Sequence, residues 1–232
     1  MALVKYGGGI IQMSGSIAGN THARNRYGNY IRAKTKPVNP RTQLQTDVRE
    51  AIQQLTTRWS QTVTDVQRVA WNLYANSVNM KNKLGEVIKL SGFNHYIRSN
   101  AIFQRLDLPV VDDGPVIFEL PEADSTFAVS ASETTQNITA TFDNTLAWAI
   151  EDGSLLCMFQ GTPQNAQRNF FAGPWRFWTA VQGVDPDGPV TPRVAPAVFA
   201  ITELQRMWVY ARIIRADGRM SEVFRADTFC VA

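Results

Sequence analysis

Few residues in this chain have the types and spacing that catalysis or metal binding requires. The two histidines, His22 and His95, lie far apart in the sequence and far from both cysteines, Cys157 and Cys230. A zinc site needs three or four suitably spaced ligands, and a nucleophilic Ser or Cys needs an oriented base beside it. His95 falls in a predicted helix, where we expect a surface or capping role. We therefore predict no catalytic residues, no metal site and no cofactor, and expect that the protein is not an enzyme.

Two further motifs that could support chemistry have simpler interpretations. The carboxylate pairs Asp112-Asp113 and Glu151-Asp152 each precede a glycine, as in solvated turns. The three glycines at 7–9 lack the Gly-Lys-Ser/Thr that completes a phosphate-binding loop. They indicate a flexible joint, or a place where backbone lies flat against a partner.

The best candidate for a functional surface is a basic segment near the N-terminus that is interrupted by tyrosines. Guanidinium groups hold phosphates or carboxylates through paired hydrogen bonds, and tyrosines stack or become buried at interfaces. Such a segment can bind nucleic acid without sequence preference or lie along an acidic groove of a protein, and composition does not choose between the two. The candidate partner-binding residues are Arg24, Arg26, Tyr27, Tyr30, Arg32, Lys34 and Lys36.

Charge is distributed unevenly along the chain. Residues 1–110 carry 15 Lys or Arg and 5 acidic residues, whereas residues 111–232 carry 8 Arg and 15 acidic residues. The first acidic residue is Asp47, so the first 46 positions are basic without compensation. This asymmetry indicates that the two segments face different surroundings, and that the basic N-terminal segment faces an acidic partner.

We expect residues 1–39 to be an extended basic arm. Six glycines are spread through this segment, and no window shows a helical apolar period. The arm nevertheless contains several isoleucines and tyrosines, more apolar material than a solvated tail usually carries. It should therefore become ordered against a neighbouring molecule.

A helical anchoring segment is predicted over residues 40–110. Asn39 followed by Pro40 favours a helix start, and Thr64 with Gln67 matches the capping box of a second helix. The first two helices should form an antiparallel hairpin, and a third should run from Ser91 to about residue 106. The expected apolar faces are Leu44, Val48, Ile52, Leu55 and Trp59 in the first helix, Val66, Val69, Ala70, Leu73 and Tyr74 in the second, and Phe93, Ile97 and Ala101 in the third.

A hinge is expected at residues 111–116, followed by an all-β domain at 117–232. Beyond the hinge the apolar period changes to alternation, with about seven short strands separated by polar or Gly/Pro turns. Tyr210 early in the penultimate strand and Asp217-Gly218 at the last hairpin tip complete a pattern that resembles a fibronectin type III or related immunoglobulin-like sandwich. Cys157 and Cys230 fall in apolar strands, where we expect reduced core thiols, with a single disulfide between them as the alternative. The predicted fold class is thus α+β.

The order of motifs over residues 5–105 resembles a group of uncharacterised virion morphogenesis proteins of tailed bacteriophages. The matching motifs are the glycines and isoleucines at 7–11, the run from Arg24 to Arg32, Pro37-Val38-Asn39-Pro40, Trp71-Asn72 with Tyr74-Ala75, and Ser91-Gly92-Phe93-Asn94-His95-Tyr96. The resemblance implies a structural virion component, foremost a head decoration or minor capsid protein and otherwise a tail or connector component. Its partners would be major capsid or tail subunits, and it would be oligomeric within the assembly.

The alternative hypothesis is a nucleic-acid-binding protein that uses the basic arm and the helical hairpin. No segment approaches the roughly 18 consecutive apolar residues of a membrane span. We therefore expect synthesis in the host cytoplasm and no membrane partner, and the phage resemblance implies a location in the virion.

Overall fold

The computed structural model describes residues 2–82 and 84–232, which divide into two compact units. The first unit contains residues 2–108 and 112–118, and the second contains residues 109–111 and 119–232. The described residues form three helices and several antiparallel sheets, so the α+β prediction is correct at this level. None of the described helices combines the length and apolar character needed to cross a membrane.

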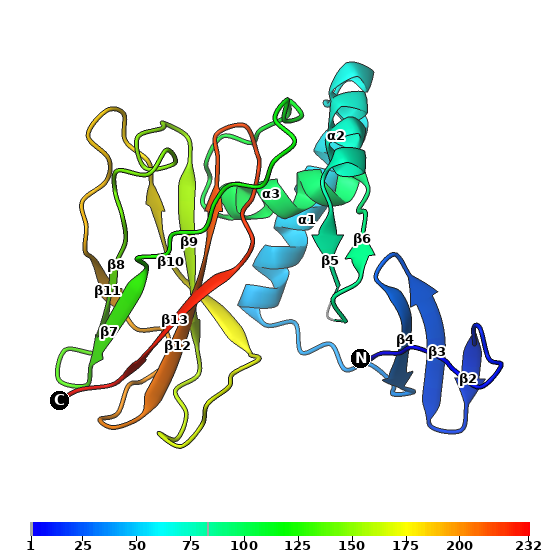
Figure 1. Cartoon of the computed structure of the whole chain (residues 1–232), viewed down its shortest axis with the longest axis horizontal. Helices are drawn as coiled ribbons and strands as arrows, with labels where there is room; N and C mark the ends of the chain where they lie inside the picture. The colour runs from blue at the N-terminus through cyan, green and yellow to red at the C-terminus, as the bar shows by residue number, and fades with distance from the viewer. Residues whose placement is uncertain (1, 83) are drawn as a thin grey trace. The chain divides into compact units, whose positions relative to one another are not determined.

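The N-terminal segment is a small antiparallel sheet rather than an extended arm (Figure 1). Its strands lie in the order β1-β4-β3-β2, and β3 pairs with β4 from Asn20 opposite Ala33 to Asn25 opposite Gly28. Gly28 has a φ of 114°, which side chains other than hydrogen rarely allow, so this glycine makes the reversal into β4. The prediction of an extended arm over 1–39 is therefore wrong where these strands lie, whereas residues 4–14 form a loop between β1 and β2. The strands are β1 (Ala2–Leu3), β2 (Gly15–Ile17), β3 (Asn20–Asn25) and β4 (Gly28–Ala33).

The three predicted helices are present, but the first starts later than expected. Its N-cap is Thr42, without a side-chain capping bond, and the Asn39-Pro40 pair lies before the helix. The capping box of Thr64 and Gln67 is confirmed, and the third helix starts as predicted, with Ser91 as its N-cap. The helices are α1 (Gln43–Gln61), α2 (Asp65–Ser77) and α3 (Gly92–Arg105), with a short β5 (Met80–Lys81) and β6 (Val87–Ile88) hairpin before α3.

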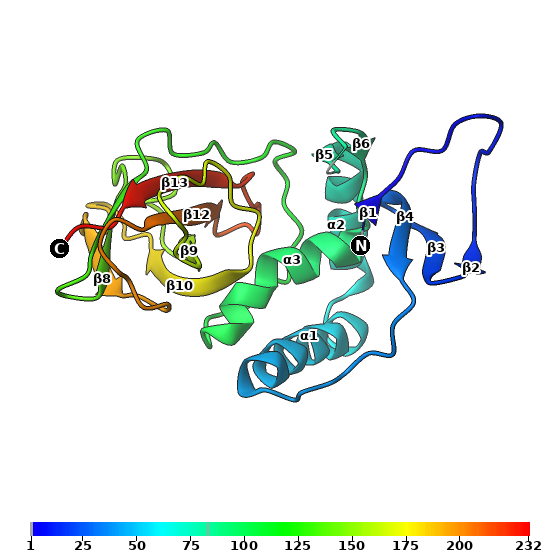
Figure 2. The same ribbon diagram turned by 90° about the horizontal axis from the view of Figure 1, so that it is seen from below.

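The helices pack through α3, which contacts both α1 and α2 (Figure 2). The expected packing of α1 against α2 as a hairpin is thus replaced by the packing of each on α3. In α2 the buried face contains Trp71, Tyr74 and Ala75, because the large indole ring of Trp71 faces Tyr96 of α3. Six of the ten apolar positions predicted for α1 and α2 are exposed, namely Leu44, Val48 and Ile52 in α1 and Val66, Val69 and Leu73 in α2, whereas Leu55 and Tyr74 are buried as predicted.

The expected hinge at residues 111–116 is largely fixed in place. Residues 112–118 belong to the first unit, and Gly114 lies against the backbone of α2. A Cβ at this position would be 2.6 Å from the backbone nitrogen of Trp71, so only glycine permits this approach. Asp112 is therefore a packing residue here, and the prediction of a solvated turn is wrong for it, whereas Asp113 is exposed and accepts one hydrogen bond from Gln67.

The second unit contains two antiparallel sheets that enclose one core (Figures 1 and 2). One sheet has the strand order β10-β9-β12-β13 and the other has the order β11-β8-β7. Ile138 of β8 and Met158 and Val209 of the larger sheet are all fully buried in the shared core. The strands are β7 (Ala128–Ser132), β8 (Asn137–Thr141), β9 (Leu155–Gly161), β10 (Trp175–Gln182), β11 (Arg193–Pro196), β12 (Arg206–Ile214) and β13 (Phe224–Phe229).

Both cysteines belong to this unit, and both are buried with free thiols. Cys157 is in β9 and Cys230 follows β13. Burial raises the pKa of each thiol above its usual range, which keeps both protonated and unreactive.

Candidate interaction surface

The basic and aromatic residues singled out in the sequence lie on and just beyond the N-terminal sheet. Arg24 is in β3, Arg26 and Tyr27 form the turn, and Tyr30 and Arg32 are in β4. Lys34 and Lys36 follow the sheet. All of them are exposed except Tyr30, which is half-buried.

The strand register separates these side chains onto two faces of the sheet. Side chains alternate between faces along a strand, and directly paired residues share a face. Tyr30 and Arg32 of β4 thus share one face with Ala23 and Thr21, whereas Arg24 belongs to the opposite face. Arg32 and Arg24 therefore belong to opposite faces of the sheet, and Arg26 lies in the turn between the strands. The spacing of these residues in the sequence did not predict this separation.

Most of the cations on this sheet have no acidic neighbour. Arg24 donates a hydrogen bond to the side chain of Gln12 at 3.2 Å. Among the residues that the structure describes, Arg26, Arg32, Lys34 and Lys36 form no ion pair. Their charges are therefore available to an external anion.

The sheet is connected to the rest of the first unit through the β5–β6 hairpin. Lys5 pairs with Glu86 at 2.8 Å, and the buried amide of Asn82 donates to the carbonyl of Tyr27 at 2.9 Å. Asn82 also donates to the Glu86 carboxylate, and the hydrogen bond from Lys5, followed by this one, lowers the pKa of Glu86. These contacts hold the basic turn at a defined position.

A second polar network in this unit is centred on Asp112. Arg58 of α1 donates to both carboxylate oxygens, at 2.8 and 2.6 Å, and the Tyr96 hydroxyl donates to Oδ1 at 3.0 Å. The indole N–H of Trp71 donates to the Asp112 carbonyl at 2.9 Å. Hydrogen bonds from Arg58 lower the pKa of Asp112, whereas burial raises the pKa of Tyr96. Asp112 therefore stays ionised and Tyr96 stays protonated near neutral pH, so neither group acts as an acid or a base there.

His95 is a buried residue, and the expectation of a surface or capping role is wrong. Its side chain is 1% exposed, and its ring contacts Tyr74 at 5.1 Å between centroids. Its Nε2 atom has no hydrogen-bond partner in the structure. Burial, together with the charge of Arg98, lowers the pKa of His95 to about 4. The neutral imidazole therefore acts as a core ring at neutral pH.

Substituting His95 with phenylalanine should flatten the pH dependence of stability between pH 6.5 and 4. In this window the unfolded chain protonates His95, whose ordinary pKa is 6.5, while the folded chain does not until about pH 4. The wild type should thus lose about 2–3 kcal/mol of unfolding free energy over this range, and His95→Phe should not lose that part. Urea unfolding followed by circular dichroism at several pH values measures the slope. Equal slopes in the two proteins would contradict the burial argument.

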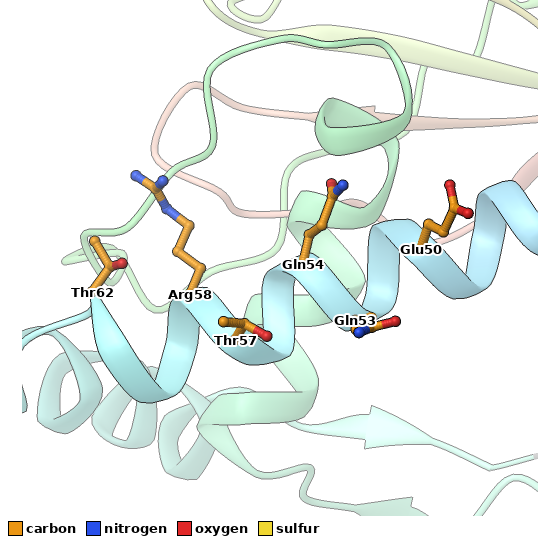
Figure 3. Close-up of a pocket in the computed structure, with 6 residues that line it drawn as sticks. All are labelled: Glu50, Gln53, Gln54, Thr57, Arg58 and Thr62. Carbon is orange, nitrogen blue, oxygen red and sulfur yellow. The ribbon is translucent and has the colours of Figure 1, made fainter.

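A shallow polar depression lies along α1 (Figure 3). Glu50, Gln54 and Arg58 project from the same side of the helix one turn apart, and Gln53, Thr57 and Thr62 complete the lining. Arg58 is already engaged by Asp112, and its neighbours are a single carboxylate, amides and hydroxyls. This set contains no nucleophile with an adjacent base, so the depression has the chemistry of a hydrated helix surface.

The described residues contain no group of three or more His, Cys, Asp or Glu side chains that could hold a metal ion. Sequence reasoning found the exposed cations but missed the Asp112 network. No local signal identifies that network, because its members come from α1, α2, α3 and the segment after α3.

Comparisons with known proteins leave the chain without an assigned family. No family model matches the sequence, and no curated protein matches it either. Among solved structures, the chain is similar to a family 76 glycoside hydrolase from a bovine Bacteroides thetaiotaomicron strain, with 15% identity and a TM-score of 0.32. The match covers 48% of this chain and 21% of the hydrolase chain. A likeness of this size carries no argument about fold or activity.

Proposed function

We propose that this chain is a structural component of a viral particle, foremost a head decoration or minor capsid protein and otherwise a tail or connector component. The observation that carries the proposal is the basic N-terminal sheet, in which Arg26 and Arg32 are exposed without an acidic neighbour among the described residues. Such a surface suits an acidic region of a neighbouring subunit. The sequence resemblance over residues 5–105 supports the same assignment.

The edges of the N-terminal sheet support an anchoring role. The three-residue strand β2 is an edge strand that pairs with β3. An edge strand offers backbone groups to a strand of another chain, which gives affinity through main-chain hydrogen bonds. Ile11 and Ile17, beside and within this strand, are exposed and can pack against the same neighbour.

We further propose that the second unit is a fibronectin type III-like sandwich. Immunoglobulin-like domains divide about seven antiparallel strands between two packed sheets. In chain order, the first, second and fifth strands of this unit form one sheet, and the third, fourth, sixth and seventh form the other. This arrangement differs from the constant-type immunoglobulin domain in placing the fourth strand beside the third. In the proposed particle, this acidic unit would face solvent.

Reversing the charge of the N-terminal sheet should reduce incorporation into particles at least tenfold. The test variant carries Arg26→Glu and Arg32→Glu, and deletion of residues 1–36 should abolish incorporation. The matched control carries Arg176→Glu and Arg193→Glu, two exposed arginines of the second unit, and so has the same net charge. Both proteins are supplied to particles assembling without the wild-type chain, and incorporation is measured by quantitative mass spectrometry. Equal incorporation of the two variants would refute anchoring by the sheet.

The same measurement on wild-type particles tests the location. Density-gradient-purified, nuclease-treated particles should contain this chain at a fixed ratio to the major shell protein. Copy number reports the position, because the symmetry of each part of a particle fixes how many copies it holds. Hundreds of copies would favour decoration, and about a dozen or fewer would favour a vertex, connector or tail. Absence from the particles would refute the virion assignment.

Nucleic-acid binding is the second candidate function, and the exposed cations Arg26, Arg32, Lys34 and Lys36 favour it. Phosphate contacts from such residues give affinity that falls steeply with salt. Duplex and single-stranded DNA binding should then weaken strongly between about 50 and 200 mM salt. No measurable binding at low salt would remove this candidate.

A further inference from the structure

The outer face of the larger sheet in the second unit carries a row of aromatic side chains. Along β12, Val209 and Ala211 face the core, so Tyr210 points away from it. The strand register places Phe177, Phe159, Tyr210 and Arg225 side by side across β10, β9, β12 and β13. An outer sheet face is ordinarily polar, so this row is unusual in position as well as in composition.

The rings of this row form one continuous set of contacts. Phe159 and Tyr210 are stacked with centroids 4.5 Å apart and an interplanar angle of 12°. Phe177 meets Phe159 edge to face at 5.5 Å, and Trp175 meets Tyr210 in the same way at 4.9 Å. Phe159, Trp175, Phe177 and Tyr210 are all half-buried, so each offers part of its ring to solvent.

A cation without a carboxylate partner lies beside these rings. The guanidinium of the exposed Arg225 is 5.5 Å from the Trp175 ring centroid and forms no ion pair among the described residues. By contrast, Arg206 at the end of the same face pairs with Asp227 at 2.7 Å. One guanidinium nitrogen of Arg225 donates to the Phe171 carbonyl at 3.5 Å, and its other N–H groups can donate to a carboxylate. The absence of an ion pair is unexpected here, because acidic residues outnumber arginines in residues 111–232.

The orientation of the rings determines which partner fits. Side chains stand roughly perpendicular to a sheet, so two stacked rings on neighbouring strands expose their edges rather than their faces. Ring edges carry partial positive charge and attract carboxylate and carbonyl oxygens, whereas nucleobases and sugars stack on exposed ring faces. Aromatic and arginine side chains are also the commonest hot spots of protein interfaces.

We propose that this surface, defined by Phe159, Trp175, Phe177, Tyr210 and Arg225 and here called the aromatic face, binds an acidic segment of a partner protein. A carboxylate of the segment pairs with Arg225, and its apolar side chains pack on the ring edges. The aromatic face belongs to the second unit, so this role is independent of the anchoring proposed for the N-terminal sheet.

The test uses the full chain and a short fluorescein-labelled peptide of glutamate and leucine, with binding followed by fluorescence anisotropy at low salt. Arg225→Gln should weaken binding about tenfold or more, as expected for a hot-spot arginine. Tyr210→Leu should do the same by removing the ring. The matched control is Arg193→Gln, which alters an exposed arginine of the other sheet and should leave binding unchanged.

Two further controls separate this site from others. A variant with Arg26→Gln and Arg32→Gln should retain the Arg225-dependent binding, because those residues lie in the first unit. Labelled oligothymidylate should show no dependence on Arg225. Peptide binding that is absent, or unchanged in Arg225→Gln, would overturn the proposal. Oligothymidylate binding that requires Arg225 would assign the aromatic face to nucleic acid instead.

Discussion

Asp112→Asn is expected to lower the unfolding free energy of the first unit by about 2–3 kcal/mol near pH 7, the usual cost of losing a charge-assisted hydrogen-bond set. The wild-type carboxylate accepts both hydrogen bonds of the Arg58 fork and one from the Tyr96 hydroxyl. An amide cannot accept all three, and it leaves the Arg58 charge without its partner. The partial exposure of Arg58 keeps the loss below that of a fully buried pair.

The neighbouring carboxylate supplies a matched control for this substitution. Asp113 accepts one hydrogen bond from Gln67, at 2.8 Å, and that bond is exposed. Asp113→Asn changes the net charge by the same amount and should cost less than about 0.5 kcal/mol. Because all helices of the described chain lie in the first unit, urea unfolding followed by far-ultraviolet circular dichroism reports on that unit. Equal losses in the two variants would contradict a special role for Asp112.

The effect of Asp112→Asn should also depend on pH with a definite sign. Hydrogen bonds from Arg58 hold the folded-state pKa of Asp112 below its unfolded value, so its contribution is fully present above the unfolded pKa, near 4. It is lost as the pH falls through the folded pKa. The difference between wild type and Asp112→Asn should therefore shrink below about pH 4, whereas the His95 contribution changes between pH 6.5 and 4.

Sequence patterns predicted the secondary structure better than the packing. The capping box at Thr64 located the start of α2, because capping depends on residues close in the chain, and the start of α3 at Ser91 was also predicted correctly. The apolar stripe predicted for α2 was correct for Tyr74, which is buried, and wrong for Val66, Val69 and Leu73, which are exposed, because periodicity does not reveal that Trp71 bonds to Asp112. Burial is decided by distant partners, and a single sequence does not contain their positions.

The same limit explains the two largest errors, at the N-terminal segment and at the expected hinge. Polar strands such as β2 and β3 have no apolar alternation, so the sheet is recognised only through the pairing between segments. Likewise, Asp112-Asp113-Gly114 has the composition of a turn, yet Gly114 is required by its contact with Trp71. Composition identified the exposed cations, since surface charge needs no partner to be recognised.

Several motifs that carry the phage resemblance meet in the core of the first unit. Gly92 begins α3, and its N–H donates to the side chain of Asn72 in α2 at 3.2 Å. The ring of Tyr96 faces Trp71, with centroids 5.7 Å apart, and His95 faces Tyr74. The segments around 71–75 and 91–96 are therefore two sides of one helix contact, and Gly92 lies directly against the backbone of Trp71 and Asn72.

Gly92→Ala should destabilise the first unit by about 3 kcal/mol, the upper end of the usual cost of overpacking. An added Cβ would lie 2.6 Å from the Asn72 side-chain oxygen and 2.7 Å from backbone atoms of Trp71 and Asn72, and backbone does not yield cheaply. Helix propensity alone predicts the opposite sign, a gain of up to about 1 kcal/mol. Gly19→Ala is the control, because nothing lies within 4 Å of its Cβ position. Thermal unfolding followed by circular dichroism shows whether Gly92→Ala lowers or raises stability. A Gly92→Ala protein as stable as Gly19→Ala would show that α2 and α3 pack less closely than described.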